Sequence, residues 1–115
     1  MRKLSTHAVG IAQGDAVLFS DFEHDGEMWT GEGPRLKRHA IRFDEPFRQP
    51  PAITVSVSML DISNGANTRF DVQAEKIGRQ GFEIVFRTWG DSRVARARVA
   101  WQAIGPVSGE EDWEL

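Results

Sequence analysis

Apolar and polar residues alternate with a period of two along most of the chain. In residues 53–59, for example, isoleucine, valine and methionine alternate with threonine and serine. Because successive side chains of a β-strand point to opposite faces, this pattern predicts a half-buried strand. Six strands are expected, the last one shorter than the others: 39–43, 53–59, 69–75, 82–87, 95–101 and one within 8–19. No window fits a helical period better, so we expect no helix longer than about two turns.

Residues that favour turns separate these strands. A proline-rich segment at 46–51 interrupts two of them, because proline cannot donate to a hydrogen-bonded ladder. Residues 78–81 have glycine at both ends, as in a hairpin connection, and Gly90 with Asp91 makes a turn directly after Trp89. Short strands with polar turns at regular spacing predict an all-β antiparallel sandwich or barrel.

Residues 21–34 differ from the rest because they carry no strand pattern. They are rich in glycine, glutamate and aspartate, yet they include Met28 and Trp29. Long loops that interrupt a β-sheet scaffold often carry function. We therefore expect this segment to contribute to a binding site.

Length and charge place further limits on the chain. Its 115 residues predict a single domain over 1–115, with a core at 38–105, an N-terminal strand and long loop at 1–37, and an acidic tail at 106–115. The net charge of −3 argues against a nucleic-acid partner and against binding to anionic membranes. No apolar run reaches the length needed for membrane insertion, and no signal peptide is evident, so a cytoplasmic start or non-classical export is expected.

Catalytic and metal-binding signals are missing from the sequence. There is no cysteine, and the three histidines, His7, His24 and His39, have no metal-ligand spacing. No phosphate-binding glycine loop and no local nucleophile motif occur. We therefore expect no cofactor, no metal and no enzyme activity.

Several short motifs recur together between residues 41 and 105. They are Phe-x-x-Pro-Phe at 43–47, Leu-Asp before a loop that ends in Asn-x-Arg at 67–69, Thr-Trp at 88–89, and a final strand ending in Trp-x-Ala-Ile at 101–104. In this order and spacing they resemble the H-type lectin domain family, which includes the snail agglutinin and the C-terminal domain of discoidin. The first forty residues match loosely.

The resemblance implies both an architecture and a function. It implies a six-stranded antiparallel β-sandwich that forms a homotrimer, with sugar sites near the protomer boundaries. It also implies adhesion-type binding of galactose-like sugars, often N-acetylgalactosamine (GalNAc), without catalysis. Small residues of the last strand would leave room for close approach of protomers: Ala95, Ala97, Ala100 and Ala103.

Trp89 and Arg69 are the first two candidate sugar-binding residues. An indole offers a flat surface to the apolar face of a galactose-type ring, and the family has a sugar contact at the position of Trp89. The alternative is that Trp89 is a core aromatic at a strand end. Arg69 stands at the family's Asn-x-Arg position, where its planar fork can donate to neighbouring hydroxyls. Its alternative role is to hold the loop, through Asp61.

A carboxylate and the turn after Trp89 complete the expected site. Counting back from the Phe-x-x-Pro-Phe motif places the family's acid at Glu32, with Asp25 and Glu27 as rivals if the loop carries an insertion. The best-known members have histidine directly after the tryptophan, whereas this chain has Gly90, so that side-chain contact is absent. Asp91 either compensates for it or caps the turn.

Two alternatives remain open. Four arginines cluster late in the chain: Arg87, Arg93, Arg96 and Arg98. They would form a solvated face balanced by nearby acids, an intersubunit ladder with Glu75 or Glu83, or a patch that binds an anionic glycan or phosphate. The rival function is a structural or assembly module, as in a phage-like particle, with a vestigial sugar site. That alternative stays open because Gly90 lacks the side-chain contact that histidine makes in the best-known members.

Overall fold

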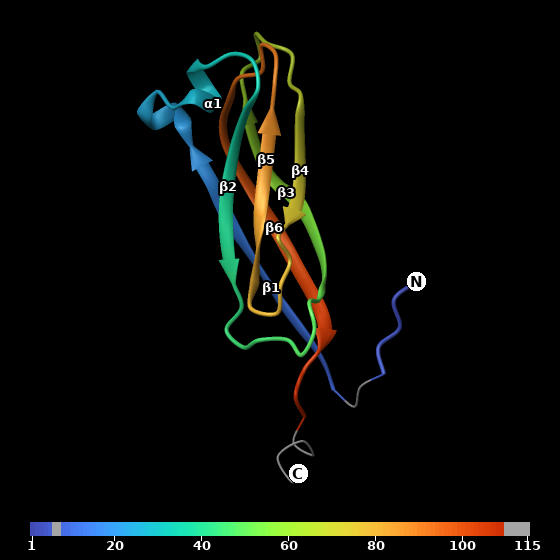
Figure 1. Cartoon of the computed structure of the whole chain (residues 1–115). Coiled ribbons are helices and arrows are strands. Elements are labelled where there is room, and N and C mark those ends of the chain that lie inside the picture. The colour runs from blue at the N-terminus through green and yellow to red at the C-terminus, as the bar shows by residue number, and fades with distance from the viewer. Residues whose placement is uncertain (6–7, 110–115) are drawn as a thin grey trace.

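The computed structural model describes residues 1–5 and 8–109 and contains six strands. In chain order they are β1 (Val9–Ser20), β2 (Arg35–Arg42), β3 (Ala52–Ile62), β4 (Phe70–Glu75), β5 (Gly81–Thr88) and β6 (Val94–Pro106). They form two antiparallel sheets with strand orders β1-β6-β3 and β2-β5-β4, which pack face to face (Figure 1). The expected all-β, six-stranded architecture is confirmed, and it is a sandwich rather than a barrel.

Most strands are longer than the sequence pattern predicts, and the difference matters most in β1 and β2. β1 has 12 residues, so the expectation of a short N-terminal strand is wrong. It pairs with β6 from Val9 opposite Pro106 to Ser20 opposite Arg96, although polar and small residues weaken its alternation. β2 begins at Arg35 rather than at residue 39, and the sequence pattern misses this start because the inward-facing positions there are occupied by polar side chains.

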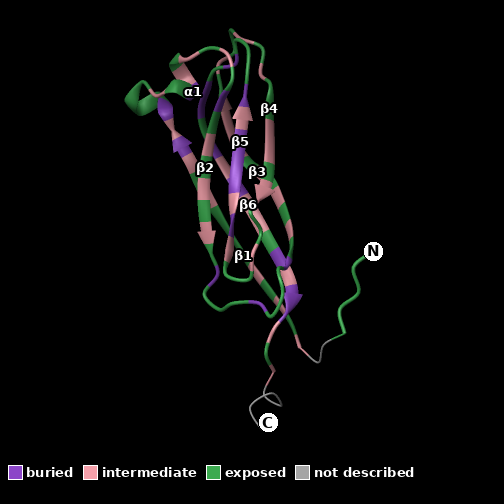
Figure 2. Cartoon of the chain, in the orientation of Figure 1, coloured by how far each residue is buried: buried purple, intermediate pink, exposed green. Residues whose placement is uncertain are grey.

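The core consists of two hydrophobic clusters between the sheets, centred on the middle strands β5 and β6 (Figure 2). The first is nearer the chain ends and contains Phe43, Phe47, Phe82, Ile84, Val99 and Ala103. The second contains Phe19, Met28, Phe86, Val94 and Ala97. Met28 is fully buried, so the segment before β2 is anchored directly in the second cluster.

Residues 21–34 form a folded cap rather than an open loop. It contains a 3-10 turn, η1 (Asp21–His24), and a single-turn helix, α1 (Glu27–Thr30), in agreement with the expected absence of long helices. The buried Asp21 carboxylate accepts a hydrogen bond from the Met28 amide at 3.0 Å. A Cβ on Gly26 would lie 2.3 Å from Asp21 Cγ, so this contact requires glycine.

The outer face of the β2-β5-β4 sheet carries a network of ion pairs. Arg87 Nη2 lies 2.7 Å from Glu75 Oε2, and Arg38 Nη1 lies 3.1 Å from Glu83 Oε2 and 3.4 Å from Glu75 Oε1. Val85 projects from the same face of β5 and is nevertheless fully buried. Both acids of the expected intersubunit ladder are therefore already paired within the chain.

The late arginines of β5 and β6 lie on solvated sheet faces, as one of the alternatives expected, whereas the alanines have a different role. Arg96 Nη2 pairs with Asp61 Oδ2 at 3.1 Å, and Arg98 Nε donates to Ser58 Oγ at 3.0 Å, across the outer face of the other sheet. Three of the four alanines thought to leave room for a neighbouring protomer are buried inside the sandwich instead: Ala95, Ala97 and Ala103. Their small size serves the packing between the sheets.

Some expectations concern residues that the structure does not describe. His7 and the acidic tail beyond residue 109 lie outside the described residues. Among the residues that are described, no helix has the length and hydrophobicity required to span a membrane.

The Glu75 pairs predict a contribution to stability that depends on pH. The hydrogen bond from Arg87, and further the charge of Arg87 and the contacts of Arg38, hold the pKa of Glu75 below its ordinary value of 4.5. Because the folded state lowers this pKa, the contribution is present above pH 4.5 and is lost as the pH falls through the folded-state pKa. In urea titrations from neutral pH to about pH 3, Glu75→Gln should lose stability on acidification less steeply than wild type.

Glu45→Gln is the matched control, because Glu45 is an exposed acid in the connection between β2 and β3. It should follow the wild-type pH dependence. Equal pH dependence in wild type and Glu75→Gln would contradict the role assigned to the Glu75 pairs.

Candidate functional site

The candidate site lies where β5 ends, at the end of the sandwich opposite the start of β1 and the end of β6 (Figure 1). Thr88, the last residue of β5, pairs with Arg35 of β2 and with Phe70 of β4. Trp89 therefore follows β5 with Pro34 on one side and Arg69 on the other. Trp89 is 43% exposed, so the alternative that it is a core aromatic is wrong.

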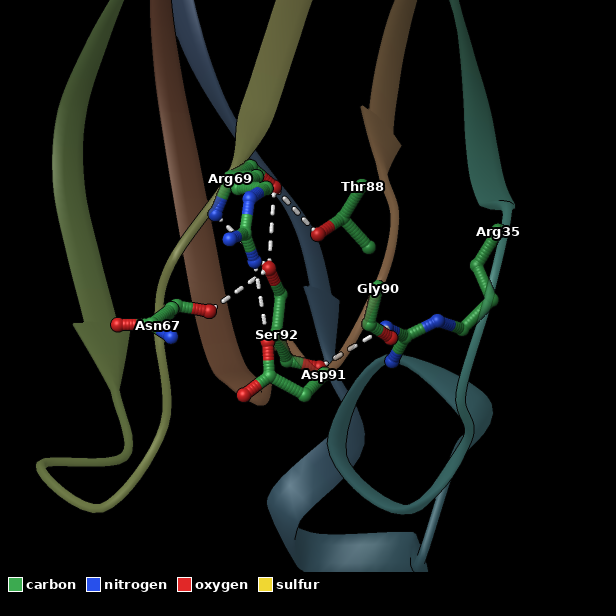
Figure 3. Close-up of polar contacts among 7 residues, drawn as sticks. All are labelled: Arg35, Asn67, Arg69, Thr88, Gly90, Asp91 and Ser92. Carbon is green, nitrogen blue, oxygen red and sulfur yellow. Dashed lines mark hydrogen bonds and ion pairs between the residues drawn. The ribbon is translucent and has the colours of Figure 1, made fainter.

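Arg35 is a buried arginine that joins the cap to the turn after Trp89 (Figure 3). A guanidinium has five N–H donors, and each of them has a backbone carbonyl partner here. Nε donates to Gly33 O at 2.9 Å, Nη1 to Glu27 O and Met28 O at 3.1 and 3.3 Å, and Nη2 to Gly90 O and Ser92 O at 3.3 and 2.9 Å.

The partners of Arg35 are dipoles rather than charges. Among the described residues no carboxylate forms an ion pair with it. Burying a charge is costly unless its hydrogen-bonding capacity is used, and five carbonyl partners use all of it. Arg35 thus fixes the cap, between residues 27 and 33, against the turn at 90–92.

Arg69 is held through both its backbone and its side chain (Figure 3). Its amide donates to the buried Ser92 Oγ at 2.8 Å, and its carbonyl accepts from Thr88 Oγ1 at 2.5 Å. Its Nη1 lies 3.0 Å from Asp91 Oδ1, in a pair whose side chains are 46% and 58% exposed. The expected contact with Asp61 is wrong, because that acid pairs with Arg96.

The turn residues Gly90 and Asp91 shape the surface beside Trp89. Gly90 has φ +68°, a conformation that favours glycine, and a Cβ there would lie 3.3 Å from Arg69 Nη1. The absence of a side chain at this position therefore lets the Arg69 guanidinium lie over the turn. Asp91 binds this guanidinium, so its side chain orients Arg69.

The three candidate acids differ in how they are placed relative to Trp89. Glu32 is exposed and adjoins Gly33, whose amide donates to Gly90 O at 2.9 Å. Glu27 borders a hollow of about 450 Å³ beside Trp89, which is lined by Glu27, Pro34, Arg35, Leu36, Arg87, Thr88 and Trp89. Asp25 has φ 51°, and its carbonyl accepts from Thr30 Oγ1 within the cap.

A second exposed aromatic group lies on the cap. The rings of Phe22 and Trp29 meet edge to face with centroids 5.3 Å apart, and Phe22 is 59% exposed. The Arg93 guanidinium lies 4.9 Å from the Trp29 ring centroid, and its Nε donates to Trp29 O at 2.9 Å. This cation–π contact covers one face of Trp29, so Trp89 is the better placed indole for a ligand.

Sequence reasoning did not identify Arg35 or Ser92. A signal for Arg35 exists, because Ile41 packs against the core and residue 35 has the same parity on the same strand. An arginine at an inward position of a strand indicates a buried charge that needs partners. For Ser92 no such signal exists, since a serine in a polar turn is common.

Metal binding finds no support in the described residues. His24 is exposed, with Nε2 3.9 Å from Glu23 Oε2, and His39 is half-buried in β2. Within residues 1–5 and 8–109, no three histidine, aspartate or glutamate side chains gather as a metal site would require.

Arg35 provides a direct test of how the site is built. In Arg35→Lys the single ammonium has three donors and no planar fork, so it leaves buried carbonyls without partners. We expect the free energy of unfolding to fall by about 3 kcal/mol, with increased hydrogen exchange in the cap. Urea titration and amide exchange measure both. Arg42→Lys, an exposed change on the same strand, should leave both unchanged. Wild-type stability in Arg35→Lys would contradict the assigned role.

Known proteins resemble this chain in sequence and in fold. The profile of the H-type lectin domain matches residues 38–104, which include Arg69 and Trp89. A protein from Fuscovulum blasticum, "ATP synthase subunits region ORF 7", is 54% identical over 108 residues, covering 94% of each chain. A discoidin-1 polypeptide from Dictyostelium discoideum is 31% identical over 75 residues, covering 64% of this chain and 30% of that protein.

Solved structures of discoidin II from the same organism share the fold, with a TM-score of 0.75 at 19% identity. They cover 91% of this chain, which spans 40% of discoidin II. The chain thus spans nearly all of its relative from Fuscovulum blasticum but less than half of either discoidin. On the match over residues 38–104, the chain belongs to the H-type lectin domain family, a family of non-catalytic carbohydrate-binding modules.

Proposed function

We propose that this chain binds galactose-type sugars, including GalNAc, at the turn after β5. The observation that carries the proposal is the half-exposed Trp89 beside an arginine whose backbone and side chain are both held in place. A large exposed aromatic next to an oriented guanidinium combines an apolar platform with directional donors. That combination suits a sugar ring, which has one C–H face and a rim of hydroxyls.

Each of the two main residues has a distinct task. The indole of Trp89 stacks on the apolar face of the ring and selects for ring shape. Arg69 donates to neighbouring hydroxyls or to the acetamido oxygen of GalNAc, while Asp91 keeps the guanidinium oriented. Because Arg69 is held before the ligand arrives, its contacts with the sugar cost little side-chain entropy.

A carboxylate completes the site by accepting hydrogen bonds from sugar hydroxyls. We assign this role to Glu32, because its neighbour Gly33 is bonded to the turn at Gly90. Gly90 contributes its open surface rather than a side chain, and no imidazole is available at this position. The site is therefore shallow, and we expect binding of a single sugar to be weak.

Useful affinity would come from a homotrimer that presents three sites. The outer face of the β1-β6-β3 sheet is the surface that we assign to the contact between protomers, because β3 turns small side chains outward as far as its bulge at Ser58: Ala52, Thr54, Ser56 and Ser58. Linked sites raise the effective concentration of the second and third contacts. Such a particle suits adhesion to surfaces that display many glycans.

Sugar binding is tested by calorimetry and a glycan array with wild type and two site variants. Trp89→Ala should weaken binding of GalNAc about tenfold or more, because it removes the apolar platform. Arg69→Lys should weaken it severalfold, because an ammonium cannot form the planar fork. Phe22→Ala removes an exposed aromatic outside the site and should bind as wild type does.

Two results would contradict the proposal. If wild type binds no sugar at several concentrations on the array, the alternative of a structural or assembly module takes its place. If Trp89→Ala binds as well as wild type while remaining folded, the site is elsewhere on the molecule.

Trimer formation is tested by sedimentation equilibrium at about micromolar concentration. We expect a species of three chain masses. Ser56→Arg, which places a large charged side chain on the outer face of β3, should release monomers, whereas Gln73→Arg on the outer face of β4 should not. A wild-type monomer at this concentration would contradict the trimer.

A further inference from the structure

The hollow beside Trp89 lies on the side away from Arg69. Leu36 pairs with Arg87, and both project from the outer face of the β2-β5-β4 sheet, next to the strand end that carries Trp89. Arg69 precedes β4 on the opposite side of β5. Trp89 therefore forms a wall between the Arg69–Asp91 pair and a hollow of about 450 Å³.

We propose that this hollow is a second subsite, which binds a neutral sugar unit adjacent to the galactose-type unit in the same glycan. The inference rests on the proposed function, because Trp89 is shared by both subsites. A hollow of this size next to an aromatic wall is in the range of small-ligand sites. A glycan lying across Trp89 would reach it without a change of the fold.

The walls of the hollow favour an apolar surface on the ligand. Leu36 is 42% exposed, Trp89 is 43% exposed, and Pro34 adjoins them. A single exposed apolar side chain is common on a protein surface, but here several of them border one hollow. They match the C–H face of a pyranose ring or the methyl of an acetamido group.

The hollow offers no free charged donor to an acidic sugar, because the Arg35 guanidinium that lines it uses all five N–H groups on backbone carbonyls. The Arg87 guanidinium is neutralised within the chain, since its Nη2 lies 2.7 Å from Glu75 Oε2 and its Nη1 lies 3.9 Å from Asp71 Oδ2. The Glu27 side chain is exposed and forms no ion pair with another described residue. The carboxylate of Glu27 can therefore accept hydrogen bonds from hydroxyls and repels sialic acid, uronic acid or sulfate.

Calorimetry with three probes tests the subsite: GalNAc, neutral disaccharides that end in GalNAc, and one such disaccharide with sialic acid on its second unit. Wild type should bind at least one neutral disaccharide severalfold more tightly than GalNAc. It should bind the sialylated form no more tightly than GalNAc. Leu36→Ser should lose the gain and keep its affinity for GalNAc. Glu27→Gln should bind the sialylated form more tightly than wild type does.

Ile77→Ser is the matched control, since Ile77 has a similar exposure of 39% and lies in the β4–β5 turn at the far end of the same sheet. It should bind all three probes as wild type does. Binding of GalNAc with no gain for any neutral disaccharide, or a gain that survives in folded Leu36→Ser, would overturn the subsite alone. No binding of any probe by wild type would overturn the proposed function and the subsite with it.

Discussion

The binding end of this sandwich depends on one buried guanidinium. Arg35 brings a positive charge out of water, and that cost is offset by hydrogen bonds from all five of its donors to backbone carbonyls. These carbonyls belong to the cap and to the turn after Trp89, which are far apart in the sequence. One backbone hydrogen bond joins the two segments directly, from the Gly33 amide to Gly90 O, and Arg35 supplies the further bonds between them.

The candidate site follows from this connection. The turn is fixed at Gly90 and Ser92 by Arg35, and Ser92 in turn holds the amide of Arg69. Trp89 is therefore presented between two ordered neighbours although it lies at an exposed strand end. This prior order suits the shallow sugar site and the repeated sites that we propose, because binding then requires little reorganisation of the residues.

Most of the strands were predictable from the sequence, and the strand ends that were missed have a physical explanation. Alternation predicted strands wherever one face is apolar, as in β3 and β5, but it weakened in β1 and at the start of β2. In β2 the inward position of Arg35 breaks the pattern because its partners are carbonyls from distant segments, which no local period records. The cap was expected to be a loop because its contacts are also with distant segments, although Met28 anchors it in the core.

The site was only partly predictable. Trp89, Arg69, Gly90 and Asp91 adjoin one another as the motifs suggest, since they follow from strand ends and turn chemistry. The choice among Glu32, Glu27 and Asp25 was not predictable, because it depends on how the cap folds against the turn. That packing is set by Arg35 and by the contact of Asp21 with the Met28 amide.

The central claim is that sugar binds on the indole of Trp89, and the indole N–H signals in a nuclear magnetic resonance titration test it most directly. The chain has four tryptophans, so each indole can be assigned by substitution. On titration with GalNAc, the Trp89 signal should move with saturation, while the signals of Trp29 beneath Arg93 and of Trp101 in the core stay in place. A shift confined to Trp29, or no shift of any indole signal, would contradict the account.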